Sequence, residues 1–193
     1  MTTTVNPVTI HVVSPSRKHS RDEILAAAVE TAFDGGLSQL SFGRVARRLG
    51  IADRTVVYYF PTIGDLIAHV VVMLGLQLQA TLEPAFEGGA AEPIELVRRA
   101  WPALTNPEAD ATFGLFFEAN GLAAAGRSPY DAIVPQLVEG WIDWATGYFT
   151  GPEEQRRADA EAAIALLDGV LLLRQLAGPE PADRAAARLG IVG

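Results

Sequence analysis

The sequence has no cysteine and only three histidines, His11, His19 and His69. Without thiols the chain can form no disulfide, no thiolate nucleophile and no cysteine-ligated zinc site. The three histidines are scattered along the sequence, which argues against a site where several of them hold one metal ion. We therefore expect neither a metal nor another cofactor.

Long apolar runs are also missing, since no window reaches the roughly 18 uninterrupted apolar residues of a membrane span. Residues 1–15 lack the basic segment and long apolar stretch of a secretory signal. These absences predict a cytoplasmic protein with no membrane partner. Apolar residues are nevertheless abundant at 49%, with few aromatics and much alanine, which favours closely packed helices over a sheet.

Positive charge is scarce, because the net charge is −8, but it is unevenly distributed. Residues 1–66 contain seven Arg or Lys and six Asp or Glu, whereas residues 67–193 contain eight and seventeen. A nucleic-acid partner would therefore bind the first part of the chain. The small excess of positive charge there predicts modest non-specific affinity and a weak dependence on salt.

Residues 41–61 predict two short helices joined at a glycine. Ser41 is suited to cap the first helix, and Gly50 to end it in the left-handed conformation. The second helix runs to Phe60 and is stopped by Pro61. The first helix has an apolar face with residues at i, i+3, i+4 and i+7, namely Phe42, Val45, Ala46 and Leu49.

The second of these helices has one buried and one outward face. Val56 and Phe60, four residues apart, face inward. Arg54, Thr55 and Tyr58 face outward. An arginine can bind guanine or phosphate, a hydroxyl can bind phosphate, and an aromatic ring can contact thymine methyls or the backbone. The pair therefore predicts a helix-turn-helix whose second helix enters the major groove of double-stranded DNA.

The stretch LGIADRTVVYYFP, followed by Asp65 and Leu66, is similar to the signature of the tetracycline-repressor (TetR/AcrR-like) family of bacterial transcription regulators. The resemblance is close over residues 20–66. It extends loosely further through an all-helical body and the segment DGVLL at 168–172. The chain departs from the family's usual serine, tyrosine, histidine and lysine at Ala52, Val57, Tyr59 and Ile63.

The resemblance implies an all-α fold with an N-terminal three-helix DNA-binding head and a C-terminal helical body for ligand binding and dimerisation. The implied segments are a flexible arm over 1–16, the head over 17–63 and the body over 64–193. It implies a ligand-responsive regulator, a repressor released from a near-palindromic operator by a small apolar effector. The predicted DNA contacts are Arg17, Lys18, Ser41, Arg44, Asp53, Arg54, Thr55, Val57, Tyr58 and Tyr59.

The rest of the chain is predicted to be helical. Ser20 and Glu23 form a capping-box pattern at the start of the first helix, which ends at Gly35 and Gly36. Its predicted buried stripe is Ile24, Leu25, Ala28, Val29, Ala32 and Phe33. The later helices are predicted over 62–84, 94–104, 107–125, 130–149, 153–177 and 182–189.

The middle helices concentrate aromatic residues, and the family resemblance places a small-molecule pocket among them. Aromatic residues at helical spacing are as often plain core as ligand contacts, and His69 also fits a satisfied core histidine. Glu118 and Asn120 are polar within apolar stretches and, if buried, need a partner that a ligand could supply. The predicted effector contacts are His69, Met73, Trp101, Phe113, Phe116, Phe117, Asn120, Trp141, Trp144 and Tyr148.

Helix 153–177 has two apolar stripes, more than one monomer core can cover. A partner copy should cover the second stripe, with helix 130–149 packing beside it, giving a homodimer. The predicted interface residues are Leu137, Trp141, Leu166, Gly169, Val170, Leu173 and Leu176.

Two other functions are weighed against the regulator. One is a small-molecule-binding module of the same fold that has lost specific DNA binding, which Asp53, Val57 and Ile63 make conceivable. The other is an enzyme, for which the case is thin: the sequence has no thiol, no paired histidines, no phosphate-binding glycine loop and no close pair of carboxylates. The sequence therefore predicts no catalytic residues.

Overall fold

The computed structural model describes residues 19–192, so the predicted arm over 1–16 and the predicted DNA contacts Arg17 and Lys18 lie outside the described residues. Within that part of the chain the fold is all-α, as predicted. A single isolated bridge joins Ala90 and Phe149. The elements are α1 (Arg21–Gly35), η1 (Leu37–Gln39), α2 (Phe42–Leu49), α3 (Asp53–Tyr59), α4 (Ile63–Phe86), α5 (Pro93–Leu104), α6 (Pro107–Ala124), α7 (Tyr130–Thr146), α8 (Glu153–Ala177) and α9 (Pro179–Leu189).

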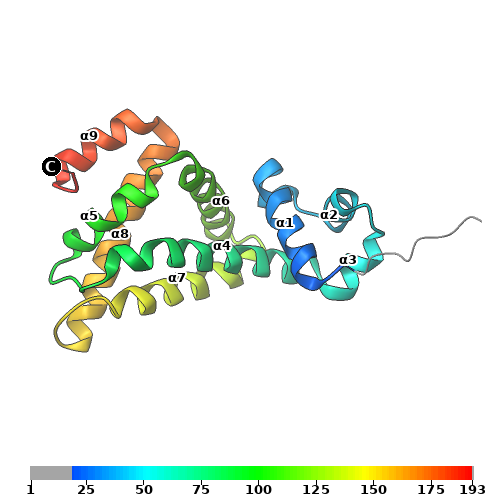
Figure 1. Ribbon diagram of the computed structural model, residues 1–193, viewed down its shortest axis with the longest axis horizontal. Coiled ribbons are helices and arrows are strands. Elements are labelled where there is room, and N and C mark those ends of the chain that lie inside the picture. The colour runs from blue at the N-terminus through cyan, green and yellow to red at the C-terminus, as the bar shows by residue number, and fades with distance from the viewer. Residues whose placement is uncertain (1–18, 193) are drawn as a thin grey trace, which may run out of the picture.

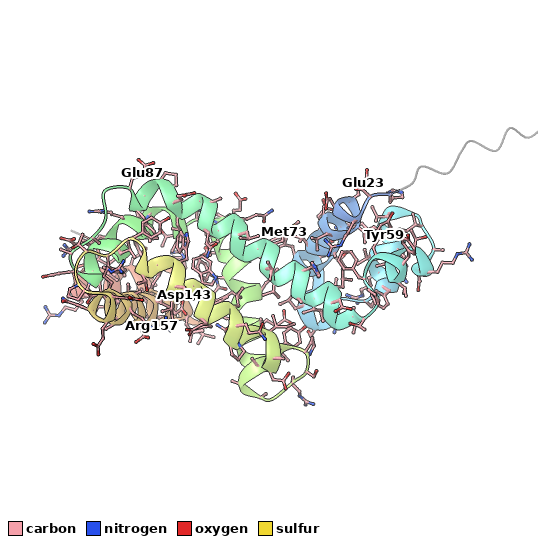
Figure 2. All side chains as sticks on the ribbon, turned by 90° about the horizontal axis from the view of Figure 1, so that it is seen from below. Glu23, Tyr59, Met73, Glu87, Asp143 and Arg157 are labelled. Carbon is pink, nitrogen blue, oxygen red and sulfur yellow. The ribbon has the colours of Figure 1, made fainter. Side chains whose placement is uncertain are left out.

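The molecule is elongated, with a small head at one end and a larger body at the other (Figure 1). Helices α1, α2 and α3 form the head. Helix α4 runs from the head along the whole body, and α6 approaches the head beside α1. Met73 lies midway along α4, between Tyr59 in the head and Glu87 at the far end of the body (Figure 2).

Local capping signals set the limits of the head helices. Ser20 is the N-cap of α1 and forms the predicted capping box with Glu23. The Ser41 hydroxyl accepts a hydrogen bond from the Arg44 amide at 3.3 Å, and Gly50 ends α2 with a φ of 67°. The prediction for Phe33 is wrong, because its side chain is 43% exposed. The apolar stripe of α1 therefore ends at Ala32.

Helix α4 is the connector between head and body. Thr62 and Asp65 form a capping box at its start, which the sequence analysis did not identify. The helix continues past Pro84 to Phe86, so the predicted end at residue 84 is wrong. A proline in the last turn removes only one intrahelical hydrogen bond, and the buried Phe86 side chain keeps that turn on the body.

Helix α4 is also, among the described residues, the one helix long and apolar enough to meet the length and composition criteria for a membrane span. Its apolar residues are used inside the protein. Leu66, Val70 and Leu74 belong to the hydrophobic core of the head, and Leu82 and Phe86 to that of the body. Because α4 is a core helix of both parts, this criterion does not indicate a membrane protein.

The body helices follow the predicted ranges closely. Pro93 is the first residue of α5, and α8 begins and ends where predicted. Helix α7 stops at Thr146, so the predicted extension to residue 149 is wrong. Phe149 instead forms the bridge to Ala90. On the surface between α7 and α8, the Arg157 Nη1 atom donates to Asp143 at 2.8 Å (Figure 2).

Candidate DNA-binding face and effector cavity

The predicted DNA-reading helix presents an outward face with one prominent side chain. Val56 and Phe60 are fully buried, as predicted, so they fix α3 against the head. Tyr58 is 79% exposed, Arg54 is exposed and Thr55 is half-buried. A phenol and a guanidinium standing free on one short helix can contact base edges and phosphates in the major groove.

Tyr59 is held in place by the start of α1. Its hydroxyl donates a hydrogen bond to the backbone carbonyl of His19 at 3.0 Å, and its ring meets that of Tyr58 edge-on at 5.0 Å. Tyr59 is half-buried, so less of it than of Tyr58 is open to a partner. Its position indicates that it orients Tyr58.

The arginines of α2 differ in their freedom. Arg48 forms ion pairs with Glu30 and Asp34 of α1, so its charge is largely neutralised within the head. Arg44, a predicted DNA contact, is exposed in the first turn of α2 beside the N-cap Ser41. Arg44 is therefore better placed than Arg48 to bind a phosphate.

Positions that depart from the family pattern lie at helix starts or on the surface. Ala52 is the N-cap of α3 and offers no side-chain hydrogen bond, while Asp53 occupies the first turn, where an acid favours the helix dipole. Asp53 does not itself cap the helix. Val57 and Ile63 are exposed apolar side chains. Each supplies apolar contact surface but no hydrogen bond to a phosphate.

The body encloses an apolar cavity between α4, α6, α7 and α8. Its space for water-sized molecules is about 80 Å³. Only Thr112 and Asp168 contribute polar side chains to it. The other lining residues are Leu37, Val71, Leu74, Gly75, Leu78, Leu82, Leu104, Phe113, Leu115, Phe116, Ala119, Leu137, Val138, Trp141, Ile164 and Leu167.

Three of the predicted effector contacts, Phe113, Phe116 and Trp141, line this cavity. Trp144 lies in an adjoining smaller cavity lined by Trp141 as well. The others lie elsewhere. Trp101 is buried in the body core, with Phe117 packed against that core, Tyr148 stacks on Phe86, and Met73 packs against the core of the head.

The two remaining predicted contacts, His69 and Asn120, also lie outside the cavity lining. His69 faces the head, where its ring meets Phe60 edge-on at 5.4 Å and its Nδ1 atom lies 2.6 Å from the Asp65 carbonyl oxygen. It is therefore a satisfied histidine of the head junction. The Asn120 Oδ1 atom is buried with no hydrogen-bond partner among the described residues.

Glu118 of α6 joins the body to the head. Its carboxylate accepts hydrogen bonds from the backbone amides of Leu37 at 2.8 Å and Ser38 at 2.9 Å. Gly36 precedes them with a φ of 85°, and a Cβ atom there would lie 2.8 Å from Glu118 Oε2. The Leu37 side chain lines the cavity. One head residue is thus bound by α6 and also forms part of the cavity wall.

Tyr130 of α7 is buried near this junction. Burial, and to a smaller extent the charge of Glu118, raise the pKa of Tyr130 to about 12. The hydroxyl therefore stays protonated at every physiological pH. It has no hydrogen-bond partner among residues 19–192.

Asp168 is the only ionisable residue in the cavity lining. It forms no hydrogen bond or ion pair with the described residues, and burial raises its pKa from 3.8 to about 6. Because the folded state binds this proton more tightly than the unfolded state, ionisation opposes folding. The stability held below pH 4 is lost as the pH rises from about 4 to about 6.

We therefore predict that Asp168→Asn stabilises the protein at pH 7 by about 1–3 kcal/mol and has little effect at pH 4. The amide is uncharged at both values, so the variant removes the cost of burying the carboxylate. Urea unfolding at the two pH values checks this. An equal effect at both would mean that the charge of Asp168 is not the cause.

The residues predicted for the dimer interface divide into two groups. Leu137 and Trp141 line the cavity, and Val170 is 4% exposed in the body core, so the inclusion of Val170 in a surface stripe is wrong. Leu166 is half-buried. Gly169, Leu173 and Leu176 are exposed on α8, together with Leu172, which the sequence analysis did not include.

Sequence reasoning missed most of the cavity lining. Aliphatic residues such as Val71, Leu78 and Ile164 form much of the wall, and nothing in their spacing separates them from ordinary core residues. It noted Glu118 as polar in an apolar stretch but did not find its partners. That lone acid was the available signal.

Comparison with known proteins agrees with this geometry. Residues 24–70 match the family described as "Bacterial regulatory proteins, tetR family", a range that covers α2, α3 and most of α1. No curated protein matches the sequence.

Solved structures similar to this chain are transcriptional regulators at low sequence identity. One from Rhodococcus sp. Rha1 has 21% identity and a TM-score of 0.69, over 90% of this chain and 94% of that one. The multidrug binding protein EbrR complexed with proflavin has 23% identity and a TM-score of 0.63, over 88% and 98%. A TetR transcriptional regulator from Legionella pneumophila has 22% identity and a TM-score of 0.60, over 89% and 95%.

The fold and the helix-turn-helix define a DNA-binding regulator of transcription. The chain belongs to the tetR family of bacterial regulatory proteins. Members of that family regulate transcription and are not enzymes.

Proposed function

We propose that this protein is a cytoplasmic, ligand-responsive repressor that binds a near-palindromic operator as a homodimer and is released by a small apolar effector. The observation that carries the proposal is that Leu37, a residue of the head, forms part of the wall of the body cavity. The head over 17–63 would bind the operator, and the body over 64–193 would bind the effector and the partner copy.

The small volume of the cavity supports a response to ligand. About 80 Å³ holds only several water molecules, so an effector with an aromatic ring needs the lining helices to move apart. Helix α4 continues into the head, and α6 holds η1 through Glu118. Displacement of either helix therefore changes the position of α3. Ligands that prefer the displaced state will weaken operator binding, and operator will weaken ligand binding by the same factor.

The similar fold of EbrR complexed with proflavin also supports a ligand-binding body. A gel shift with the DNA upstream of the protein's own coding region, in the presence and absence of candidate effectors, tests the proposal. Specific binding that an effector weakens is the expected result. Ligand binding with no specific DNA binding would leave the small-molecule-binding module, an alternative that the exposed Val57 and Ile63 support.

The exposed face of α3 gives a sharper prediction. Arg54→Ala should weaken operator binding by about 1–3 kcal/mol and relax the base preference at one position, if Arg54 binds guanine with both nitrogens. The double variant with Tyr58→Ala should lose more, because Tyr58 is the most exposed aromatic of the head. Fluorescence anisotropy with labelled operator and single-base substitutions measures both effects.

Arg184→Ala is the matched control for this experiment. Arg184 is a 71% exposed arginine of α9, so its loss removes the same charge far from the head. It should leave operator affinity unchanged. Wild-type affinity and base preference in the Arg54→Ala/Tyr58→Ala variant would show that α3 is not the reading helix.

A further inference from the structure

Asp168 stands out because its surroundings do not explain its charge. It is placed on α8 beside Leu167, on the wall of a cavity whose other lining side chains are apolar except for Thr112. No described arginine, lysine or histidine pairs with it, and no backbone amide or hydroxyl donates to it. An unpaired carboxylate against an apolar cavity is unfavourable for folding unless something else compensates for it.

Other buried charges of the body are compensated. Arg174, also on α8 and largely buried, donates to both oxygens of Asp110 at 2.6 and 3.0 Å. The comparison shows that this fold pairs a buried charge where its role is structural. Asp168 has no such role, since its pKa is raised by burial and no protein group lowers it.

The aromatic rings of the cavity add a second feature of the same kind. Phe113, Phe116 and Trp141 line the cavity that Asp168 lines, from α6 and α7. The faces of such rings attract cations, most strongly when water is excluded. A carboxylate and several aromatic rings on one otherwise apolar wall together suit an apolar ligand with one positive charge.

We infer that the effector of this protein is an apolar organic cation, such as a quaternary ammonium or a protonated amine, whose charge is bound by Asp168 and whose rings pack on Phe113, Phe116 and Trp141. This inference rests on the proposed effector function of the cavity. It adds the charge of the ligand and the residue that selects it. An ion pair formed inside the cavity replaces the compensation that the protein itself does not provide.

The test uses two ligands of the same shape, benzyltrimethylammonium and neopentylbenzene, which differ by the exchange of a positively charged nitrogen for carbon. Titration calorimetry at pH 7 without DNA should show that the wild-type protein binds the cation more tightly than the neutral compound. In Asp168→Asn the affinity for the cation should fall on the order of tenfold or more. The affinity for neopentylbenzene should stay the same or rise.

Asp159→Asn is the matched control, because Asp159 lies on the same helix but does not line the cavity. It should leave both affinities unchanged. The inference is overturned if wild type does not bind the cation, if it binds the neutral compound as tightly, or if Asp168→Asn and Asp159→Asn have the same effect. Thermal unfolding of the variants verifies that they fold.

A second arm separates this inference from the proposed function. The same ligands are added to the complex of the wild-type protein with its upstream DNA. Cation binding that depends on Asp168 without any change in operator affinity would support the inference and contradict the proposed response to ligand. Operator release by neopentylbenzene alone would support the proposed function and overturn the inference.

Discussion

Replacing Glu118 by alanine should lower the free energy of unfolding by about 2–4 kcal/mol, because it removes two hydrogen bonds to a charged acceptor. Both bonds cross from the body to the head, at 2.8 Å to the Leu37 amide and 2.9 Å to the Ser38 amide. The Leu37 amide is partly buried and would lose its partner without access to bulk water, whereas the more exposed Ser38 amide can bind water instead. Urea unfolding gives the size of the effect.

Hydrogen exchange locates the same effect. In the wild-type protein the Leu37 and Ser38 amides should be protected, and in Glu118→Ala they should exchange much faster. Glu118→Gln should lie between the two, because its amide keeps one acceptor oxygen but replaces the other by a donor. Glu83→Ala is the control, since Glu83 is an exposed acid of α4 without a hydrogen bond among the described residues. Unchanged exchange at Leu37 and Ser38 in Glu118→Ala would contradict the role assigned to Glu118.

The same variant bears on signalling between the two sites. Helix α6 carries Phe113 and Phe116 into the cavity and Glu118 to the head, so it contacts both ends of the proposed coupling. Without Glu118, movement of α6 is transmitted to η1 only by packing. The factor by which an effector weakens operator binding should therefore decrease, while effector affinity in the absence of DNA stays close to that of the wild type.

The head was largely predictable from the sequence because its determinants are local. Ser20 with Glu23, the N-cap Ser41 and the left-handed Gly50 each act within a few residues of the helix end that they define. The alternation of Val56 and Phe60 with exposed residues likewise follows from one short helix. Local hydrogen bonding and helical periodicity decide such features before any tertiary contact forms.

The cavity could not be predicted in the same way, because its wall is assembled from four helices that are distant in the sequence. An aromatic residue at helical spacing can face either the cavity or the surrounding core, and Phe113 and Trp101 illustrate the two outcomes. Glu118 and its acceptor role depend on a contact with residues about 80 positions earlier in the chain. Pattern within one helix carries no information about such a partner.

The exposed stripe on α8 supports the other large effect that we predict. Gly169, Leu172, Leu173 and Leu176 lie on the outer face of α8, and Leu176 is 79% exposed. Leucines repeated at this spacing form an apolar surface along one helix, which a partner copy related by a two-fold axis would cover. We therefore predict a homodimer in which α8 packs against α8 of the partner, with α7 beside it.

Gly169→Leu should separate this dimer into monomers and abolish operator binding without unfolding the chain. A Cβ atom at Gly169 meets no atom within 4 Å inside the protomer, so the new side chain fits the monomer. Replacement of a helical glycine by leucine should stabilise the helix itself by roughly 0.5–1 kcal/mol. Close approach of two helices at Gly169 would instead be blocked by the larger side chain.

Gly121→Leu is the matched control, because Gly121 is an exposed glycine of α6 with no atom within 4 Å of its Cβ position, away from the predicted interface. Sedimentation at micromolar concentration should show dimers for the wild type and Gly121→Leu, and monomers for Gly169→Leu. Operator binding should follow the dimer, since a near-palindromic site with half-sites about one helical turn apart needs two heads held at fixed spacing. A Gly169→Leu protein that forms dimers as tight as those of the wild type would place the interface on another surface.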